Sequence, residues 1–282
     1  MILIADSGGS KLDWRIIQSD GSIRQASGPG FNPYYQPADD LSKSIEGHLL
    51  EKVDGEPTQV FYYGTGVSSE KNQARVKDVL MKYFNSAAIE VSHDLLGAAR
   101  GLCGSEPGIA CILGTGANSC LYDGEKITQN AMSLGWILGD EGSGSHMGKR
   151  IVVDYLRSDL PQELSDQFAN RFPSSREDIL RNVYQEERPA AYFGSFSKFI
   201  FQHLKEPYCY NLVYSGFKEF FDQNVLKYEG YEKLKIHFSG SIAFYFSDVL
   251  RQVANDLGLT VRNILESPIA GLTLYHQPKQ SS

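Results

Sequence analysis

The stretches D-S-G-G-S-K at residues 6–11 and I-L-G-T-G-A-N-S at residues 112–119 decide the fold class of this chain. Each follows a short apolar run and leads into a strand-like stretch instead of a helix. A strand, a tight glycine turn and a second strand form a β-hairpin, whose exposed N–H groups and hydroxyls can hold a phosphate. Glycine lets phosphate oxygens approach the main chain because it has no Cβ. Two such hairpins facing each other across a cleft would grip both ends of a triphosphate, which indicates a nucleotide-dependent phosphotransferase.

The glycines could also serve only to reverse the chain. A single Gly-Ser turn is more often just a turn, but its repetition in the same context, with Asp6 ending the first apolar run, favours phosphate binding. The chain has no G-x-x-x-x-G-K-[ST] motif; the nearest string, at residues 142–150, lacks the glycine spacing and the Ser/Thr. No G-x-G-x-x-G opens a helix after the first strand, so a Rossmann site is not expected.

Length and composition indicate a folded two-domain protein. The 282 residues allow two domains, each with its own core. The formal charge of −7 and the lack of a basic run argue against nucleic-acid or membrane-surface binding. No apolar run has membrane-spanning length, and Asp6 interrupts the N-terminal one, so we expect no signal peptide and a cytoplasmic location. Cysteines in apolar segments without C-x-x-C pairs are typical of reduced, buried thiols: Cys103, Cys111, Cys120 and Cys209.

The first hundred residues alternate between strand-like and helical segments. The pattern predicts strands at 1–6, 12–18, 22–26, 59–64 and 87–92, and helices at 38–53, 69–84 and 94–103. This order predicts a mixed sheet with three antiparallel strands first and parallel strands later. Residues 104–108, G-S-E-P-G, are a plausible domain boundary.

The hairpin pattern then restarts, which indicates a duplication. Strands are expected at 109–113, 118–122, 125–129 and 235–238, with mostly helix from 142 to about 230, a helix around 244–253 and a last helix at 268–276.

A duplicated β-β-β-α-β-α unit with two phosphate hairpins resembles the actin/hexokinase/Hsp70 superfamily. Within it, the sequence is similar to the N-acetylglucosamine kinase and BadF/BadG/BcrA/BcrD-type ATPase family. The motifs that carry this resemblance occur in the family's order: D-S-G-G-S-K at 6–11, G-x-x-x-N ending at Asn32, S-H-D at 92–94, L-G-T-G-A-N-S at 113–119, G-W-I-L-G-D-E-G-S at 135–143, S-G-S-I-A at 239–243 and P-I-A-G-L at 268–272.

The resemblance implies an α/β protein of two RNase H-like (actin/hexokinase-type ATPase) domains with a cleft between them. One would comprise residues 1–107 plus the C-terminal helix 268–282, and the other residues 108–267 with a helical insertion. The implied activity is ATP-dependent phosphorylation of a hydroxyl of N-acetylglucosamine or a related amino sugar, with Mg²⁺. The implied partners are a small sugar substrate and a second copy of the chain, without nucleic acid or membrane.

The resemblance also assigns nucleotide contacts, which suit a reaction that depends on positioning and charge neutralisation. Asp6 would hold Mg²⁺ through water. Lys11 would add a charge, or else face solvent. Residues around the two turns would bind phosphates: Ser7, Gly8, Gly9, Ser10, Thr115 and Gly116. The adenosine pocket would include Gly240, Ser241 and Ala243, for which a plain strand-to-helix turn is the alternative.

Asp94 is the candidate general base for the acceptor hydroxyl. The alternative is an ordinary helix N-cap, which Asp favours, and the neighbouring His93 is expected to be structural. A sugar clamp would comprise Asn32, Asn118 and Asp140, with Ala117, Gly135 and Trp136 beside it. Trp136 would cover a sugar ring or be buried. Asp140 and Glu141 would otherwise be the acidic first turn of a helix at 142–157, and Glu141 has only a supporting role.

Two other functions remain open from the sequence. One is an ATPase activator of a dehydratase or reductase, which bridges an iron–sulfur cluster across a dimer. Cys111 and Cys120 fall in predicted strands instead of at helix starts, which counts against it. The other is a sugar or nucleotide sensor without catalysis; the presence of Asp6, Asp94 and both glycine turns counts against that.

Overall fold

The computed structural model describes residues 1–9 and 11–278 and divides the chain into two compact units. Unit 1 comprises Met1–Glu106, Asp123–Ile127 and the chain from Ser267 onward. Unit 2 comprises Pro107–Tyr122 and Thr128–Glu266. The chain therefore leaves unit 1 after its first hundred residues and returns to it at the end.

The sheet of unit 1 has five strands in the order β3-β2-β1-β4-β5. These strands are β1 (Ile2–Ser7), β2 (Lys11–Ile17), β3 (Ile23–Pro29), β4 (Gln59–Gly64) and β5 (Ala88–His93). The first three are antiparallel, whereas β4 and β5 run parallel to β1. This topology confirms the mixed sheet expected from the sequence. Strand β3 runs three residues further than expected because Lys11 still pairs with Pro29.

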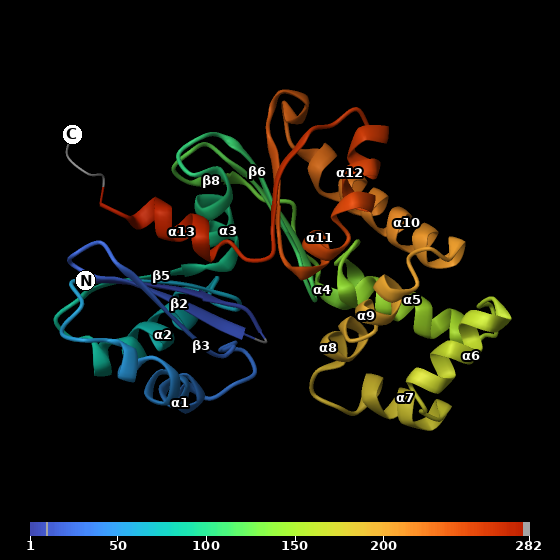
Figure 1. Cartoon of the computed structure of the whole chain (residues 1–282), viewed down its shortest axis with the longest axis horizontal. Helices are drawn as coiled ribbons and strands as arrows, with labels where there is room; N and C mark the ends of the chain where they lie inside the picture. Colours follow the sequence, from blue (N-terminus) through green and yellow to red (C-terminus); the bar gives the residue numbers. More distant parts are fainter. Residues whose placement is uncertain (10, 279–282) are drawn as a thin grey trace. The chain divides into compact units, whose positions relative to one another are not determined.

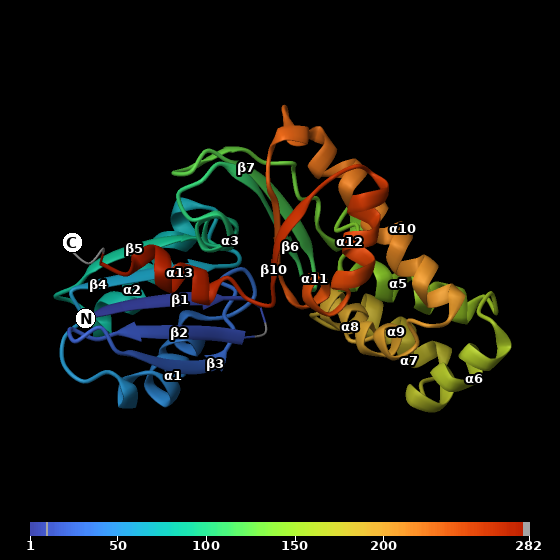
Figure 2. The same cartoon turned by 45° about the horizontal axis from the view of Figure 1, so that its top comes forward.

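Helices cover both faces of this sheet (Figures 1 and 2). Helices α1 (Ala38–His48) and α2 (Glu70–Tyr83) lie on one face, and α3 (Asp94–Cys103) and α13 (Ile269–His276) lie on the other. The strands supply alternate apolar side chains to the two faces, so Leu3 packs with Leu41 and Val76, and Ile4 packs with Ile269 and Leu272. The helix expected at 38–53 ends early, because the chain tightens after Leu49 into a 3₁₀ turn, η1 (Leu50–Lys52).

Unit 2 has a second five-stranded sheet in the order β10-β9-β6-β7-β8. Its strands are β6 (Gly108–Leu113), β7 (Ala117–Tyr122), β8 (Ile127–Gln129), β9 (Ile236–Ser239) and β10 (Val261–Leu265). Strands β6 and β7 are antiparallel, β9 is parallel to β6, and β10 is parallel to β9. Strand β8 begins two residues later than expected because the Asp123 side chain accepts hydrogen bonds from the backbone N–H groups of Glu125 and Lys126, which extends the turn.

The remainder of unit 2 is mostly helical, as expected. Its helices are α4 (Gly135–Leu138), α5 (Gly144–Leu156), α6 (Gln162–Arg171), α7 (Arg176–Tyr184), α8 (Pro189–Gly194), α9 (Ser197–Gln202), α10 (Pro207–Gln223), α11 (Ser241–Tyr245) and α12 (Ser247–Asp256), with 3₁₀ turns η2 (Val225–Lys227) and η3 (Tyr231–Lys233). Aromatic side chains form much of the core; Phe220 and Phe221 of α10 both contact Phe238 of β9.

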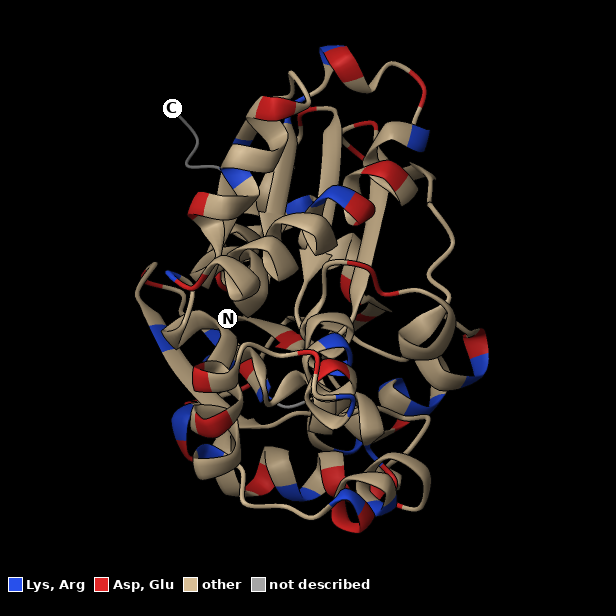
Figure 3. Ribbon diagram, turned by 90° about the vertical axis from the view of Figure 1, so that its right-hand side faces the viewer, with Lys and Arg blue, Asp and Glu red and all other residues tan. Residues whose placement is uncertain are grey.

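The cysteines lie inside the protein, and the charged side chains are spread along its helices (Figure 3). All four cysteines are buried thiols. Acidic and basic residues are interspersed along the helices (Figure 3). Within residues 1–9 and 11–278, no helix combines the length and apolarity that crossing a membrane requires.

Candidate functional site

The carboxyl ends of β1, β4 and β5 meet at one edge of the unit 1 sheet. Ser7 pairs with Gly64, which in turn pairs with His93, so the three parallel strands end at the same level. Asp6, Thr65 and Asp94 therefore lie together at this edge. In α/β sheets, ligands bind outside the carboxyl ends of parallel strands.

Asp94 is the first residue of α3, and the N-cap is its neighbour. The His93 ring Nδ1 accepts a hydrogen bond from Leu96 N at 3.3 Å, so His93 has the structural role expected and Asp94 is not the N-cap. Asp94 Oδ1 accepts from Leu95 N at 2.9 Å. Burial raises the pKa of Asp94, while His93, Leu95 N–H and the Thr65 hydroxyl lower it. A carboxylate whose pKa is shifted towards neutrality is suited to accept a proton.

Asp6 lies in the same acidic neighbourhood. The Ser267 hydroxyl donates a hydrogen bond of 2.8 Å to Asp6 Oδ2. Burial raises the pKa of Asp6, Ser267 and Lys11 lower it, and the charges of Asp94 and Asp13 raise it, so that the pKa is about 6. Carboxylates gathered in this way favour a divalent cation.

The donor set of unit 1 fits Mg²⁺ bound mainly through water. Among the described residues, no three His, Cys, Asp or Glu side chains are arranged as a direct metal cage. Mg²⁺ keeps several waters and usually takes only one or two protein carboxylates together with substrate phosphates. Asp6 is placed to supply such a carboxylate.

The β1–β2 turn leaves its side chains in different environments. The Ser7 hydroxyl is fully buried and bonds with the Phe31 backbone, at 3.3 Å to both Phe31 N and O. The Gly8 N–H closes the turn by donating to Lys11 O, and Gly9 is exposed. Lys11 has 66% of its side chain exposed and pairs with Asp13 at 2.9 Å. Ser10 lies outside the described residues.

Asn32 is held beside a glycine loop that the sequence analysis missed. Its Oδ1 accepts from Tyr34 N at 3.0 Å, and its backbone N donates to Gln36 Oε1. A Cβ on Gly66, whose φ is +75°, would lie 2.3 Å from Asn32 Oδ1. The G-T-G string at 64–66 repeats the G-T-G at 114–116, which is the signal that would have revealed it.

In unit 2, the β6–β7 turn is fastened to the start of α5. Gly144 N donates to Gly114 O at 2.8 Å, and Ser145 N donates to Thr115 O at 3.0 Å. Thr115 itself is exposed. The first N–H groups of α5 thus hold the backbone carbonyls of the β6–β7 turn. These bonds use only the backbone of Thr115, and its side chain lies at the surface.

Asp140 lies against this turn in a left-handed conformation, with a φ of +58°. Its Oδ1 accepts from Ala117 N at 3.1 Å, and a Cβ on Gly116 would lie 2.9 Å from its Oδ2. Burial raises the pKa of Asp140, which the Ala117 N–H lowers and the Glu141 charge raises. Helix α5 begins only at Gly144, so Asp140 and Glu141 precede the helix and are not its acidic first turn. A non-glycine residue keeps this conformation only where the surrounding structure fixes it, which makes Asp140 a candidate site residue.

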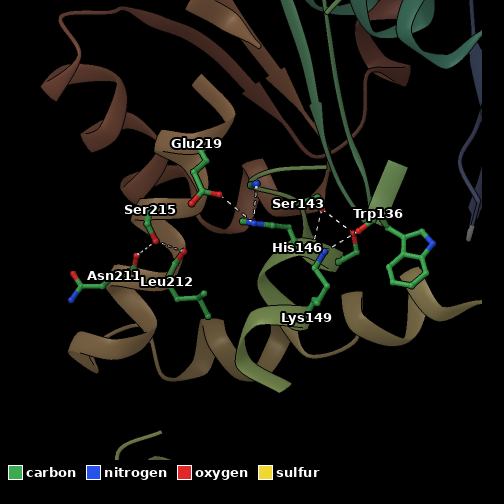
Figure 4. Close-up of polar contacts among 10 residues, drawn as sticks. Trp136, Ser143, His146, Lys149, Asn211, Leu212, Ser215 and Glu219 are labelled. Carbon is green, nitrogen blue, oxygen red and sulfur yellow. Dashed lines mark hydrogen bonds and ion pairs between the residues drawn. The ribbon is translucent and has the colours of Figure 1, made fainter. Parts of the chain in front are cut away.

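Two side chains of α5 hold the loop that carries Asp140 (Figure 4). Lys149 Nζ donates to Trp136 O at 3.1 Å, and Gly142 N donates to His146 Nδ1 at 3.3 Å. Glu219 of α10 lies 3.3 Å from the other ring nitrogen of His146. The Trp136 ring is partly buried, 5.8 Å from the ring of Phe193, so it is neither fully exposed nor fully enclosed.

Gly240 lies at the base of the same turn. Its φ is +110°, and a Cβ there would lie 2.3 Å from Leu113 O. Ser241 is exposed at the start of α11, whereas Ala243 is fully buried. Asn118 Oδ1 accepts from Ser119 N and Asn130 Nδ2. Most of the predicted site residues of unit 2 thus lie around the β6–β7 hairpin, whereas Ala243 lies in the core.

A small pocket of about 100 Å³ opens beside Asp140. Its walls come from β7, the segment before α4, the Asp140 loop and the end of α10: Ala117, Met132, Ser133, Leu134, Gly139, Asp140, Glu141, Gln223 and Asn224. Sequence analysis missed Gln223 and Asn224, because they lie far along the chain at the end of a helix with no motif.

Two mixed sheets of this topology, each with a glycine hairpin at the end of a central strand, define an α/β protein of the actin/hexokinase-type ATPase class. A crystal structure described as a "Putative N-acetylglucosamine Kinase" from Porphyromonas gingivalis is 38% identical in sequence, with a TM-score of 0.93 and 100% of both chains covered. The chain belongs to the same family, the N-acetylglucosamine kinase family, as its motifs indicated.

More distant structures share the fold. A "Putative N-acetylglucosamine Kinase" from Chromobacterium violaceum is 17% identical, with a TM-score of 0.78 and 98% of both chains covered. A "putative N-acetylmannosamine kinase" from Listeria monocytogenes is 13% identical, with a TM-score of 0.51 and 97% of both chains covered. No protein-family model matches the chain. No curated protein matches it either.

Proposed function

We propose that this protein is an ATP-dependent sugar kinase that phosphorylates a hydroxyl of N-acetylglucosamine or a related amino sugar. The observation that carries the proposal is the pair Asp6 and Asp94 at the common end of three parallel strands, where the charge of Asp94 helps to raise the pKa of Asp6. One carboxylate suits a cation and the other suits a proton, and phosphoryl transfer to an alcohol needs both. The names of the P. gingivalis and C. violaceum relatives support the choice of sugar.

In the proposed mechanism, Asp94 accepts the proton of the sugar hydroxyl while the oxygen of that hydroxyl attacks the γ-phosphorus of ATP. A bond forms between the sugar oxygen and phosphorus, the bond to the β,γ-bridging oxygen breaks, and ADP leaves with that electron pair. Mg²⁺ held through water at Asp6 would neutralise charge on the phosphates. The glycine turns of the two units would bind the phosphates through main-chain groups, because the Ser7 hydroxyl is already used inside unit 1.

The proposed sugar-binding residues divide between the units. Asn32 would contribute from unit 1, and Asn118 and Asp140 from unit 2, with Trp136 against the ring. Carboxylate and amide groups suit a sugar because each hydroxyl both donates and accepts hydrogen bonds. Gly240 and Ser241 would border the adenosine, and we propose that the two units act as two RNase H-like domains.

The test is ADP release with separate sugars: N-acetylglucosamine, N-acetylmannosamine, glucose, N-acetylmuramic acid and no sugar. We expect release that depends on an acetylated amino sugar, with the phosphorylated product identified by mass spectrometry. Equal release in every sample, including the one without sugar, would instead favour the ATPase-activator function. No nucleotide turnover, together with saturable sugar binding, would favour a sensor.

We also propose a cytoplasmic location and a homodimer. Buried thiols are suited to a reducing compartment, and ATP-dependent phosphorylation needs the cytoplasmic nucleotide pool. Light scattering after size-exclusion chromatography measures the mass directly; a single chain of 31.4 kDa would contradict the dimer.

A further inference from the structure

The side chain of Asn224 lies at the pocket beside Asp140, although the residue is only 8% exposed. It follows α10 as the C-cap, and its backbone N donates to Phe220 O. Its side-chain Oδ1 is 3.4 Å from Ser119 Oγ. Within the part of the chain that the structure describes, Nδ2 has no hydrogen-bond partner, yet it is not one of the fully buried polar atoms that lack a partner. The Nδ2 atom is therefore accessible, and the pocket that Asn224 lines is the space next to it.

A chain of buried hydroxyls fixes which end of this amide faces the pocket. Ala131 N donates to the Tyr228 hydroxyl at 2.9 Å, and that hydroxyl lies 2.6 Å from Ser119 Oγ. Because the Tyr228 oxygen accepts from Ala131 N, the Tyr228 proton goes to Ser119 Oγ, and Ser119 gives its own proton to the Asn224 side chain, whose facing atom must be the acceptor Oδ1. Oδ1 is therefore occupied, and the NH₂ group is the donor left for a ligand.

The other polar groups of the pocket are mainly acceptors. Asp140 and Glu141 contribute carboxylates, and none of the described lining residues is Lys or Arg. The Glu141 side chain makes no hydrogen bond within the described residues. The pocket therefore offers one N–H donor, Asn224 Nδ2, beside the carboxylates of Asp140 and Glu141. This set is complementary to an uncharged amide, because the amide carbonyl accepts a hydrogen bond and the amide N–H donates one. A carboxylate substituent would instead meet like charges.

We propose that Asn224 is a substrate-binding residue that recognises the acetamido group of the sugar, with Asn224 Nδ2 donating to the carbonyl oxygen and a carboxylate of the same pocket accepting from the amide N–H. The inference rests on the proposed function, since it places that sugar's amide. It predicts that the protein prefers N-acetylated sugars to glucose, because a site with a committed donor discriminates against a ligand that lacks the matching acceptor.

The test compares binding of N-acetylglucosamine and glucose to the full chain without nucleotide, by calorimetry. We expect N-acetylglucosamine to bind the natural protein at least tenfold more tightly. Asn224→Asp keeps the shape and the bond from Ser119 but replaces the donor with an acceptor. It should weaken N-acetylglucosamine binding about tenfold or more and leave glucose binding within about twofold.

A matched control is Asn170→Asp on α6, an exposed residue that does not line the pocket, which should change neither affinity. Asn224→Leu supplies a second variant if the first does not fold. Equal loss for both sugars, or no loss, overturns the inference, as does equal binding of both sugars to the natural protein. Binding that follows the expected pattern without any ADP release contradicts the kinase proposal and leaves the pocket assignment intact.

Discussion

Asp94 is the residue on which the proposed chemistry depends most. Its carboxylate is fixed at the start of α3 by Leu95 N–H, and burial raises its pKa. Asp94→Asn keeps the hydrogen-bond acceptor for Leu95 but cannot take a proton. We expect kcat to fall by about 10²–10⁴-fold with little change in sugar affinity, measured by coupled ADP release and calorimetry. Unchanged kcat would show that Asp94 is not the base.

Individual residues also show where sequence reasoning reached its limit. The motif at 135–143 pointed to Asp140 directly, because a G-D-E-G-S string of this kind is specific. Asn224 and Ser267 carried no motif: Ser267 meets Asp6 from 261 positions away, and only the folded chain brings them together. The Ser7 hydroxyl was expected at a phosphate, yet its burial depends on Phe31, whose position no local pattern shows.

At the scale of elements, the crossing of β9 into α11 is a point of close backbone approach in unit 2. Gly240 has a φ of +110°, and a Cβ there would meet Leu113 O at 2.3 Å. Gly240→Ala should therefore lower the free energy of unfolding by about 3 kcal/mol, measured by urea denaturation. Gly47→Ala is the control, since a Cβ there has open space and should slightly stabilise α1. Equal stability of both variants would contradict the close approach.

Strand prediction succeeded where apolar residues alternate cleanly and a two-residue turn joins the strands, and it was less accurate elsewhere. The Asp20-Gly21 turn and alternating apolar residues located the three antiparallel strands of unit 1, and Gly21 has the expected positive φ of 84°. Strand β10 was missed because V-R-N-I-L has no clean alternation and its pairing with β9 shifts register between Val261 and Ile264. The start of β8 was misplaced by the Asp123 turn, which the structure closes with two side-chain hydrogen bonds.

At the scale of the whole molecule, α13 gives unit 1 a pH-dependent stability. His276 stacks on Phe61 at 3.7 Å, and its Nε2 lies 2.8 Å from the Tyr63 hydroxyl, which accepts from Arg100 at 2.7 Å. Tyr63 therefore donates to a neutral ring. Burial, followed by the Arg100 charge, lowers the pKa of His276 to about 4, and Glu90 opposes the shift.

The sign of the effect follows from this lowered pKa. The unfolded chain, with the ordinary pKa of 6.5, binds the proton more readily, so this stabilisation is complete above pH 6.5 and is lost as pH falls towards about 4. After allowing for the partial exposure of the ring, the loss is about 1–2 kcal/mol. The free energy of unfolding, measured with urea at pH 7, 6 and 5, should fall by this amount as the pH is lowered. In His276→Gln the free energy of unfolding should depend less on pH. An unchanged slope in the variant would exclude His276 as its source.

The return of the chain to unit 1 has a consequence for biosynthesis. Ile269 and Leu272 cover Ile2, Ile4 and Tyr63, yet the ribosome makes them more than two hundred residues later. Until then, the nascent first unit carries an apolar face that α3 covers only in part, which is a hazard for aggregation and a natural target for chaperones. A message cut short before codon 267 would yield a polypeptide that is longer than most domains and still unable to complete its first one.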